Sequence, residues 1–238
     1  MAFDGARRPV DSSHPRHHHH HHHHHGVVTR LTSEVRPSAF AQTVWADLSG
    51  LAKLKGARLT RPGGLIDVLM LPGTLSVLLF RLSCVFHETG LRPISRLLYI
   101  LNLVLFGADL SPGAQVGPGL VIPHPVGVGF TKEARIGRDV HLVMGAALGG
   151  GRDWSEEAAK DGFPTIGDGC WIAAGAKVLG PVEIGAHALI GPNALVMRHV
   201  PAGGIAFGNP ARVIGYRHGF EPPRPPERPA PKFQADAE

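Results

Sequence analysis

From Leu110 to Val196 apolar residues recur at every sixth position, a spacing that ordinary helices and strands do not show. An amphipathic helix repeats its apolar face about every 3.6 residues and a half-buried strand every second residue, so this period fits neither. The first series comprises Leu110, Val116, Ile122 and Val128 and, after a slip of two residues, Ile136, Leu142 and Leu148. The second series comprises Ile166, Ile172, Val178, Ile184, Ile190 and Val196.

A second small or aliphatic residue follows four positions after most of these residues, and glycine often follows directly. This internal repeat predicts a β-solenoid of short strands and tight turns, in which each triangular coil uses about 18 residues and is covered by its neighbours. The aliphatic side chains fill the interior. Between the two series, residues 151–165 interrupt the repeat and predict a loop that leaves one corner of the solenoid.

Before the repeat the pattern is helical. Leu75–His87 and Ile94–Phe106 contain few helix breakers, and Gly90 with Pro93 separates them, which predicts two helices. Each apolar run is shorter than the ~20 residues that a membrane span requires. The pattern leaves two uses of this helical pair open, namely peripheral membrane contact and packing against the main domain or a partner subunit.

Four regions follow from these patterns. Residues 1–26, with consecutive histidines from His17 to His25, are expected to be a disordered His-rich segment, either a purification tag or a native tract. Residues 27–106 are expected to form an N-terminal helical region and residues 107–216 the β-helical domain. Residues 217–238, rich in proline, are expected to form a disordered tail.

Composition narrows the function classes. Glycine contributes 31 of 238 residues, nearly twice its usual share, which agrees with very frequent turns. The formal net charge is only +5 and basic residues are mixed with acidic ones, which argues against a nucleic-acid partner. Cys84 and Cys170 are too few for a disulfide framework, and the N-terminus lacks a secretory signal, so a cytoplasmic protein is expected.

Several stretches carry a resemblance more specific than the repeat: GADLSPGAQVGPGLVIPHPVGV, EARIGRDV, ALGG, IAAGAKVLGPVEIGAHALIGPNALV and GNPARVIG. Through these, residues 75–216 resemble the serine acetyltransferase family, including exopolysaccharide relatives of the colanic acid acetyltransferase kind. The resemblance implies a mainly β fold, a left-handed parallel β-helix with a small N-terminal helical segment. It also implies acetyl transfer from acetyl-CoA to a hydroxyl, and a homotrimer or a dimer of trimers.

The resemblance places two catalytic residues. His124 matches the family's general base, and Asp109, which lies 15 residues before it, matches the aspartate that orients the imidazole. An alcohol attacks a thioester at neutral pH only when its proton is removed, and imidazole has a pKa suited to that step. The carboxylate holds the imidazole tautomer and stabilises the imidazolium. Without the resemblance, both would read as ordinary turn residues.

The binding residues come from the same source. The resemblance places Gly149 and Gly150 beside the thioester, where glycine lets backbone amides approach an oxyanion. It also implies a coenzyme A groove, in which small residues admit the pantetheine arm and a basic side chain meets phosphate. The groove residues are Ala174, Gly175, Ala176, Lys177 and Arg212.

Two departures concern the acceptor. The family usually has an aspartate directly before the catalytic histidine and an Arg-His-Pro sequence after the insertion, whereas this chain has Pro123 and Gly162-Phe163-Pro164. Polar anchors for an amino acid are thereby lost. We therefore expect a larger acceptor than serine, a saccharide or secondary metabolite, that contacts Pro123 and Phe163 and is covered by Trp154. The alternative is a serine O-acetyltransferase of cysteine biosynthesis.

Three further expectations complete the sequence picture. The family's C-terminal isoleucine, which docks onto cysteine synthase, is replaced by Glu238, so no such complex is expected. The γ-class carbonic anhydrases use the same solenoid with zinc on histidines in an H-x4-H arrangement, but residues 27–238 contain no such pair and no metal site is predicted. A non-catalytic scaffold or binding module is the alternative from another class.

Overall fold

The computed structural model describes residues 37–152 and 161–224. The described chain begins with helices α1 (Pro37–Lys55), α2 (Pro62–Leu69), α3 (Pro72–Glu88) and α4 (Arg92–Phe106). Proline stands in the first turn of α2, α3 and α4, where a missing N–H leaves no helical bond unmade. The two predicted helices are thus present as α3 and α4. The sequence pattern did not single out α1 or α2.

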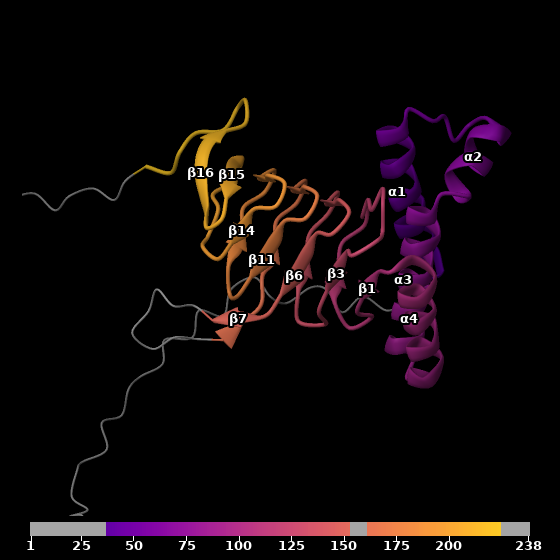
Figure 1. Ribbon diagram of the computed structural model, residues 1–238. Coiled ribbons are helices and arrows are strands. Elements are labelled where there is room, and N and C mark those ends of the chain that lie inside the picture. The colour runs from indigo at the N-terminus through magenta and orange to yellow at the C-terminus, as the bar shows by residue number, and fades with distance from the viewer. Residues whose placement is uncertain (1–36, 153–160, 225–238) are drawn as a thin grey trace, which may run out of the picture. The chain divides into compact units, whose positions relative to one another are not determined.

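From Asp109 onward the described residues form short strands that stack coil on coil (Figure 1). Their bounds are β1 (Asp109–Leu110), β2 (Gln115–Val116), β3 (Gly129–Phe130), β4 (Arg135–Ile136), β5 (His141–Leu142), β6 (Ala147–Gly149), β7 (Gly151–Arg152), β8 (Asp161–Gly162), β9 (Thr165–Ile166), β10 (Trp171–Ile172), β11 (Lys177–Leu179), β12 (Glu183–Ile184), β13 (Leu189–Ile190), β14 (Leu195–Val196), β15 (Gly204–Gly208) and β16 (Ala211–Tyr216).

Three sheets form the faces of a parallel β-helix. Sheet I has the strand order β1-β3-β6-β11-β14, sheet II the order β16-β15-β13-β10-β5, and sheet III the order β12-β9-β4-β2. All pairs within these sheets are parallel except β15 with β16, which form an antiparallel hairpin after the last coil. A second antiparallel pair, β7 with β8, begins and ends the predicted loop between the two series. Trp154 and residues 1–36 lie outside the described residues.

The hexad residues fill the interior, with one correction to the predicted register. Leu110, Leu142 and Leu148 are at most 2% exposed. Phe130 pairs in register with Leu110 and Leu148, whereas Val128 lies two residues before this position. The two-residue slip therefore comes before Val128 and not after it. The extra residues belong to the corner between Ile122 and Val128, which makes this corner longer than its neighbours.

A buried ion pair fastens the helices to the first coil. Arg81 of α3 donates from Nε to Asp47 Oδ2 of α1 over 2.8 Å, and both side chains are less than 10% exposed. Asp47 Oδ1 also accepts from the backbone N–H of Gly119 and of Leu120, each over 2.8 Å. Arg81 donates onward to the carbonyl oxygen of Gly117 over 2.7 Å. The charges are thus compensated at several points, as burial requires.

Helix α4 buries polar residues and exposes apolar ones. Its buried residues are Ser95 and Asn102, which hydrogen-bond to Ser83 and Ser76 of α3. Its exposed face carries Ile94, Leu97, Ile100, Leu101, Leu103, Val104 and Leu105. No single helix among residues 37–152 and 161–224 is long and apolar enough to span a membrane. Helices α2 and α3, which are bent by 72° at the break between them, are together long and apolar enough to span one.

Candidate active site

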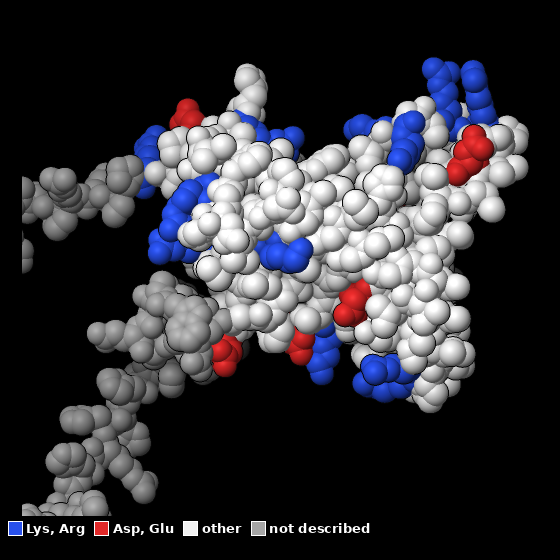
Figure 2. All heavy atoms as spheres, in the orientation of Figure 1, with Lys and Arg blue, Asp and Glu red and all other residues white. Residues whose placement is uncertain are grey.

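Sheet I brings several of the predicted site residues onto one face. The strand register aligns Asp109 with Gly129, Ala147 and Lys177 across β1, β3, β6 and β11. Adjacent strands lie about 4.8 Å apart, so Asp109 and Lys177 are separated by about 14 Å along the stack. The two residues between them are small. Figure 2 shows that this face is mostly uncharged, with isolated acidic and basic groups.

His124 lies in the lengthened corner that leads into β3, and its side chain is exposed. Backbone bonds hold this corner to the coils on either side. Gly127 N–H donates to the carbonyl oxygen of Gly107 over 2.9 Å, and Gly145 N–H donates to that of Val126 over 3.0 Å. Within the described part of the chain, the imidazole makes no side-chain hydrogen bond. Among the described residues the imidazole therefore has no partner that competes with a substrate for its nitrogens.

Asp109 is held by a residue that the sequence did not suggest. The Tyr99 hydroxyl on α4 donates to Asp109 Oδ1 over 2.7 Å, which raises the pKa of the phenol because the carboxylate stabilises its protonated form. The described residues show no hydrogen bond between Asp109 and His124. The predicted orientation of His124 by Asp109 stays a prediction.

The backbone before His124 is fixed by a close helix contact. Gly73, in the first turn of α3, lies so near the carbonyl oxygen of Ile122 that a methyl group at its α-carbon would overlap that oxygen. The same methyl would lie 3.2 Å from the carbonyl oxygen of Pro123. Only glycine fits this approach, so α3 sets the position of the segment that carries His124. The sequence signal was limited to a Pro-Gly pair at a helix start.

The predicted thioester glycines lie where β6, the central strand of sheet I, ends. Gly149 ends β6, and Gly150 follows directly. A methyl group at Gly150 would lie 2.9 Å from Phe163 Cε1, so the aromatic ring packs against this glycine. Phe163 remains 38% exposed. The structure thus brings Gly150 together with a residue predicted to contact the acceptor.

The predicted coenzyme A residues are only partly brought together. Residues 174–176 form the corner before β11, in the same column of turns as the His124 corner, and Gly175 N–H donates to the carbonyl oxygen of Met144 over 2.9 Å. Lys177 Nζ donates to the carbonyl oxygens of Gly145 over 2.8 Å and of Gly175 over 2.9 Å. Its ammonium therefore already has partners. Arg212 lies on β16 of sheet II, where its side chain is exposed.

An open cavity of about 270 Å³ adjoins Asp109. Its charged walls are Arg96, Lys132, Glu133 and Asp109 itself. Thr131 also lines it, and the Oγ1 atom of this residue is buried without a hydrogen-bond partner among the described residues. The cavity thus offers both signs of charge beside the predicted orienting acid.

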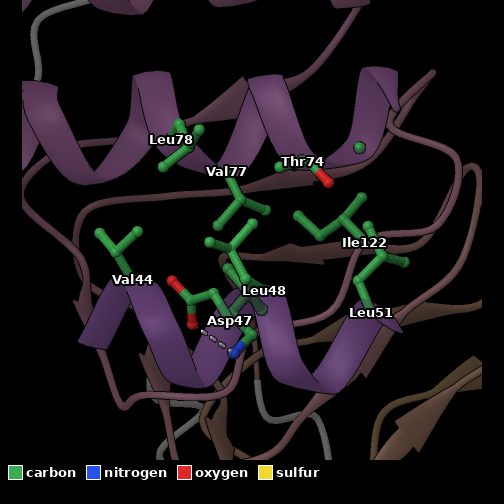
Figure 3. Close-up of a pocket in the computed structure, with 10 residues that line it drawn as sticks. Val44, Asp47, Leu48, Leu51, Thr74, Val77, Leu78 and Ile122 are labelled. Carbon is green, nitrogen blue, oxygen red and sulfur yellow. Dashed lines mark hydrogen bonds between the residues drawn. The ribbon is translucent and has the colours of Figure 1, made fainter. Parts of the chain in front are cut away.

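A second cavity does not suit a ligand. It lies between α1, α3 and the first coil, and apolar residues line it together with Gly73, Thr74 and Asp47 (Figure 3). Its free volume is about 10 Å³, at the lower limit for one water molecule. Its acid is already bound to Arg81 and to the backbone N–H of Leu120. This region is therefore part of the packing between the helices and the solenoid.

Comparisons with known proteins agree with this architecture. Residues 163–198 match the family model "Bacterial transferase hexapeptide (six repeats)". The serine acetyltransferase of Mycobacterium tuberculosis is 37% identical over 154 residues, which cover 65% of this chain and 66% of that protein. The serine acetyltransferase of Helicobacter pylori is 35% identical over 147 residues, which cover 62% of this chain and 84% of that protein.

Solved structures match a larger share of this chain. Serine acetyltransferase from Neisseria gonorrhoeae aligns with a TM-score of 0.65 and 26% identity over 75% of this chain and 67% of its own. The Brucella abortus enzyme, solved in complex with coenzyme A, aligns with a TM-score of 0.65 and 26% identity over 75% of this chain and 69% of its own. The predicted left-handed parallel β-helix is confirmed by these matches.

Proposed function

This chain belongs to the serine acetyltransferase family of hexapeptide-repeat acyltransferases, and we propose that it transfers an acetyl group from acetyl-CoA to the hydroxyl of L-serine. The observation that carries the proposal is the match to relatives named serine acetyltransferase, one of which is covered over 84% of its length. A related structure is a complex with coenzyme A, which supports acetyl-CoA as the donor.

The proposed mechanism assigns each step of this reaction to a predicted site residue. In the proposed mechanism His124 removes the proton from the acceptor hydroxyl as its oxygen attacks the thioester carbonyl carbon. Asp109 stabilises the imidazolium, and backbone N–H groups at Gly149 and Gly150 stabilise the tetrahedral oxyanion. The carbon–sulfur bond then breaks, and the imidazolium returns the proton to the departing thiolate of coenzyme A.

L-Serine is the acceptor that the comparisons favour over the larger acceptor expected from Pro123, Gly162 and Phe163. The cavity beside Asp109 adds support, because Arg96 and Glu133 give it charges of both signs and a zwitterion presents both. Cysteine biosynthesis, in which O-acetylserine is consumed, is the corresponding biological role.

One observation keeps a second acceptor class under test. The exposed ring of Phe163 lies against Gly150, at the predicted thioester position, and offers a stacking surface to a sugar or a secondary metabolite. We would measure release of coenzyme A from acetyl-CoA with L-serine and with saccharide acceptors. Saturable turnover with L-serine is expected. Turnover with a saccharide but not with L-serine would replace the serine assignment, and no coenzyme A binding would favour a scaffold.

We also propose that the chain assembles as a homotrimer or a dimer of trimers. The flat faces of a solenoid can pack against other copies, so that neighbouring copies each form part of the groove. The exposed apolar face of α4 is also suited to contact between copies. Sedimentation should show at least a trimer. Val104→Asp should reduce the assembly size if α4 lies at the contact. Flotation with lipid vesicles would instead identify peripheral membrane contact by the same face.

A further inference from the structure

Helix α4 reaches the predicted orienting acid with one neutral donor. Gly107, with φ of 64°, ends α4 in the left-handed conformation, and two residues later β1 begins at Asp109. This sharp reversal brings Tyr99, in the body of the helix, beside the carboxylate. The guanidinium of Arg96 lies 5.3 Å from the centroid of the Tyr99 ring. The phenol is thus held between a cation on its face and a carboxylate at its hydroxyl.

This arrangement constrains Asp109 without neutralising it. The Tyr99 hydroxyl occupies Oδ1, and Oδ2 has no hydrogen bond within the part of the chain that the structure describes. An exposed aspartate is otherwise free to rotate about its side-chain bonds, and a carboxylate that is not held in its productive orientation supports a slower reaction. A phenol fixes the rotation and leaves the negative charge in place, whereas a paired arginine would cancel much of it. Arg96 instead lies over the ring.

We propose that Tyr99 is a positioning residue, which holds Asp109 through Oδ1 and leaves Oδ2 to receive the imidazole of His124. The proposal rests on the proposed function, because it assigns Tyr99 a role in the same acetyl transfer. Tyr99 acts only through Asp109 and does not touch the reacting atoms. A purely structural role, tying α4 to β1, would predict loss of stability without a selective loss of kcat.

Tyr99→Phe removes a single hydroxyl and tests this role. Turnover should fall by about 10-fold, the usual range for a hydrogen bond to a charged group, with the Michaelis constants for acetyl-CoA and serine little changed. The fall should lie in kcat, because without the Tyr99 hydroxyl Asp109 spends less time in the orientation that the imidazole of His124 requires.

The matched control is Tyr216→Phe, since Tyr99 and Tyr216 are the two tyrosines of the chain. This change on β16 should leave the turnover and the Michaelis constants unaltered. A double-mutant cycle identifies the route of the effect. In an Asp109→Asn background, Tyr99→Phe should have no further effect on turnover. An equal loss in both backgrounds, or a loss of stability with kcat unchanged, would overturn the positioning role.

A titration tests the contact independently of acetyl transfer. In the Tyr216→Phe protein, tyrosinate absorbance reports Tyr99 alone. Asp109→Asn should lower the pH at which this absorbance appears, because the acceptor that raises the pKa of the phenol loses its charge. An unchanged titration would refute the proposal whatever the activity. A shifted titration in a protein that acetylates neither serine nor another alcohol would preserve the contact and refute the proposed function.

Discussion

Replacement of Gly73 by alanine should disturb the His124 segment from a helix that contributes no group to the chemistry. The added methyl would overlap the carbonyl oxygen of Ile122 and would lie 3.1 Å from the carbonyl carbon. Neither side can yield easily, because one atom belongs to a helix turn and the other to the backbone of a packed coil. The corner must therefore move by about 1 Å, at a cost of about 1–3 kcal/mol in the free energy of unfolding.

A displacement of this size has a larger effect on catalysis than on stability. Misplacing a catalytic group by about 1 Å can lower a rate ~10²-fold. Gly73→Ala should therefore lower kcat for acetyl transfer by about that factor and lower the thermal midpoint by a few degrees, with coenzyme A binding retained. Coenzyme A release in the steady state, calorimetric binding and thermal unfolding measure the three quantities.

The chain supplies a matched control. Gly63 also follows a proline in the first turn of a helix, and a methyl group there would meet nothing within 4 Å. Gly63→Ala should leave turnover unchanged and stabilise the protein by up to ~1 kcal/mol, since alanine is the better helix former. Wild-type turnover and stability in Gly73→Ala would refute the claim that this contact sets the His124 segment. Equal losses in both variants would do the same.

Three further changes have defined outcomes. His124→Ala should reduce turnover by ~10²-fold or more with coenzyme A binding intact, and unchanged turnover would remove the proposed base. Asp47→Ala should destabilise the protein by about 3–5 kcal/mol in denaturant titration, because Arg81 stays buried without its counter-ion; a change below about 1 kcal/mol would contradict the buried pair. Burial lowers the pKa of His141, which stacks on Trp171 with 4.5 Å between ring centroids. Only the unfolded chain then binds this proton as the pH falls below its usual pKa near 6.5, so stability should decrease on acidification, and His141→Gln should decrease less.

The sequence predicted the solenoid because its repeat is local and its signal is summed over many coils. Spacing alone predicts that residues such as Leu142 and Ile172 lie in the interior. The register error at Val128 has a physical cause. Val128 and Phe130 are both buried, so spacing alone does not show which of them is the repeating interior residue of this coil. The sequence pattern therefore assigned the two extra residues to the turn after β3, whereas they lie in the His124 corner before it.

The site was predicted less completely because its supports are long-range. Tyr99 and Gly73 act through contacts with Asp109 and Ile122 that no repeat or spacing specifies. Lys177 was assigned to phosphate by resemblance, but the fold turns its ammonium toward two backbone carbonyls. These features depend on how the helices and turns pack, which a pattern of single residues does not encode.

The aligned register of sheet I fixes the distances between residues along this face. Asp109, Gly129, Ala147 and Lys177 occupy equivalent positions on successive strands, so the distance along this face changes only in steps of about 4.8 Å, one per coil. Removing residues 129–146 as one coil would join matching interior positions and bring Lys177 one step nearer to Asp109. The distance between Asp109 and Lys177 is thus set by the number of coils between them, and it can be altered by whole coils without redesign of the turns.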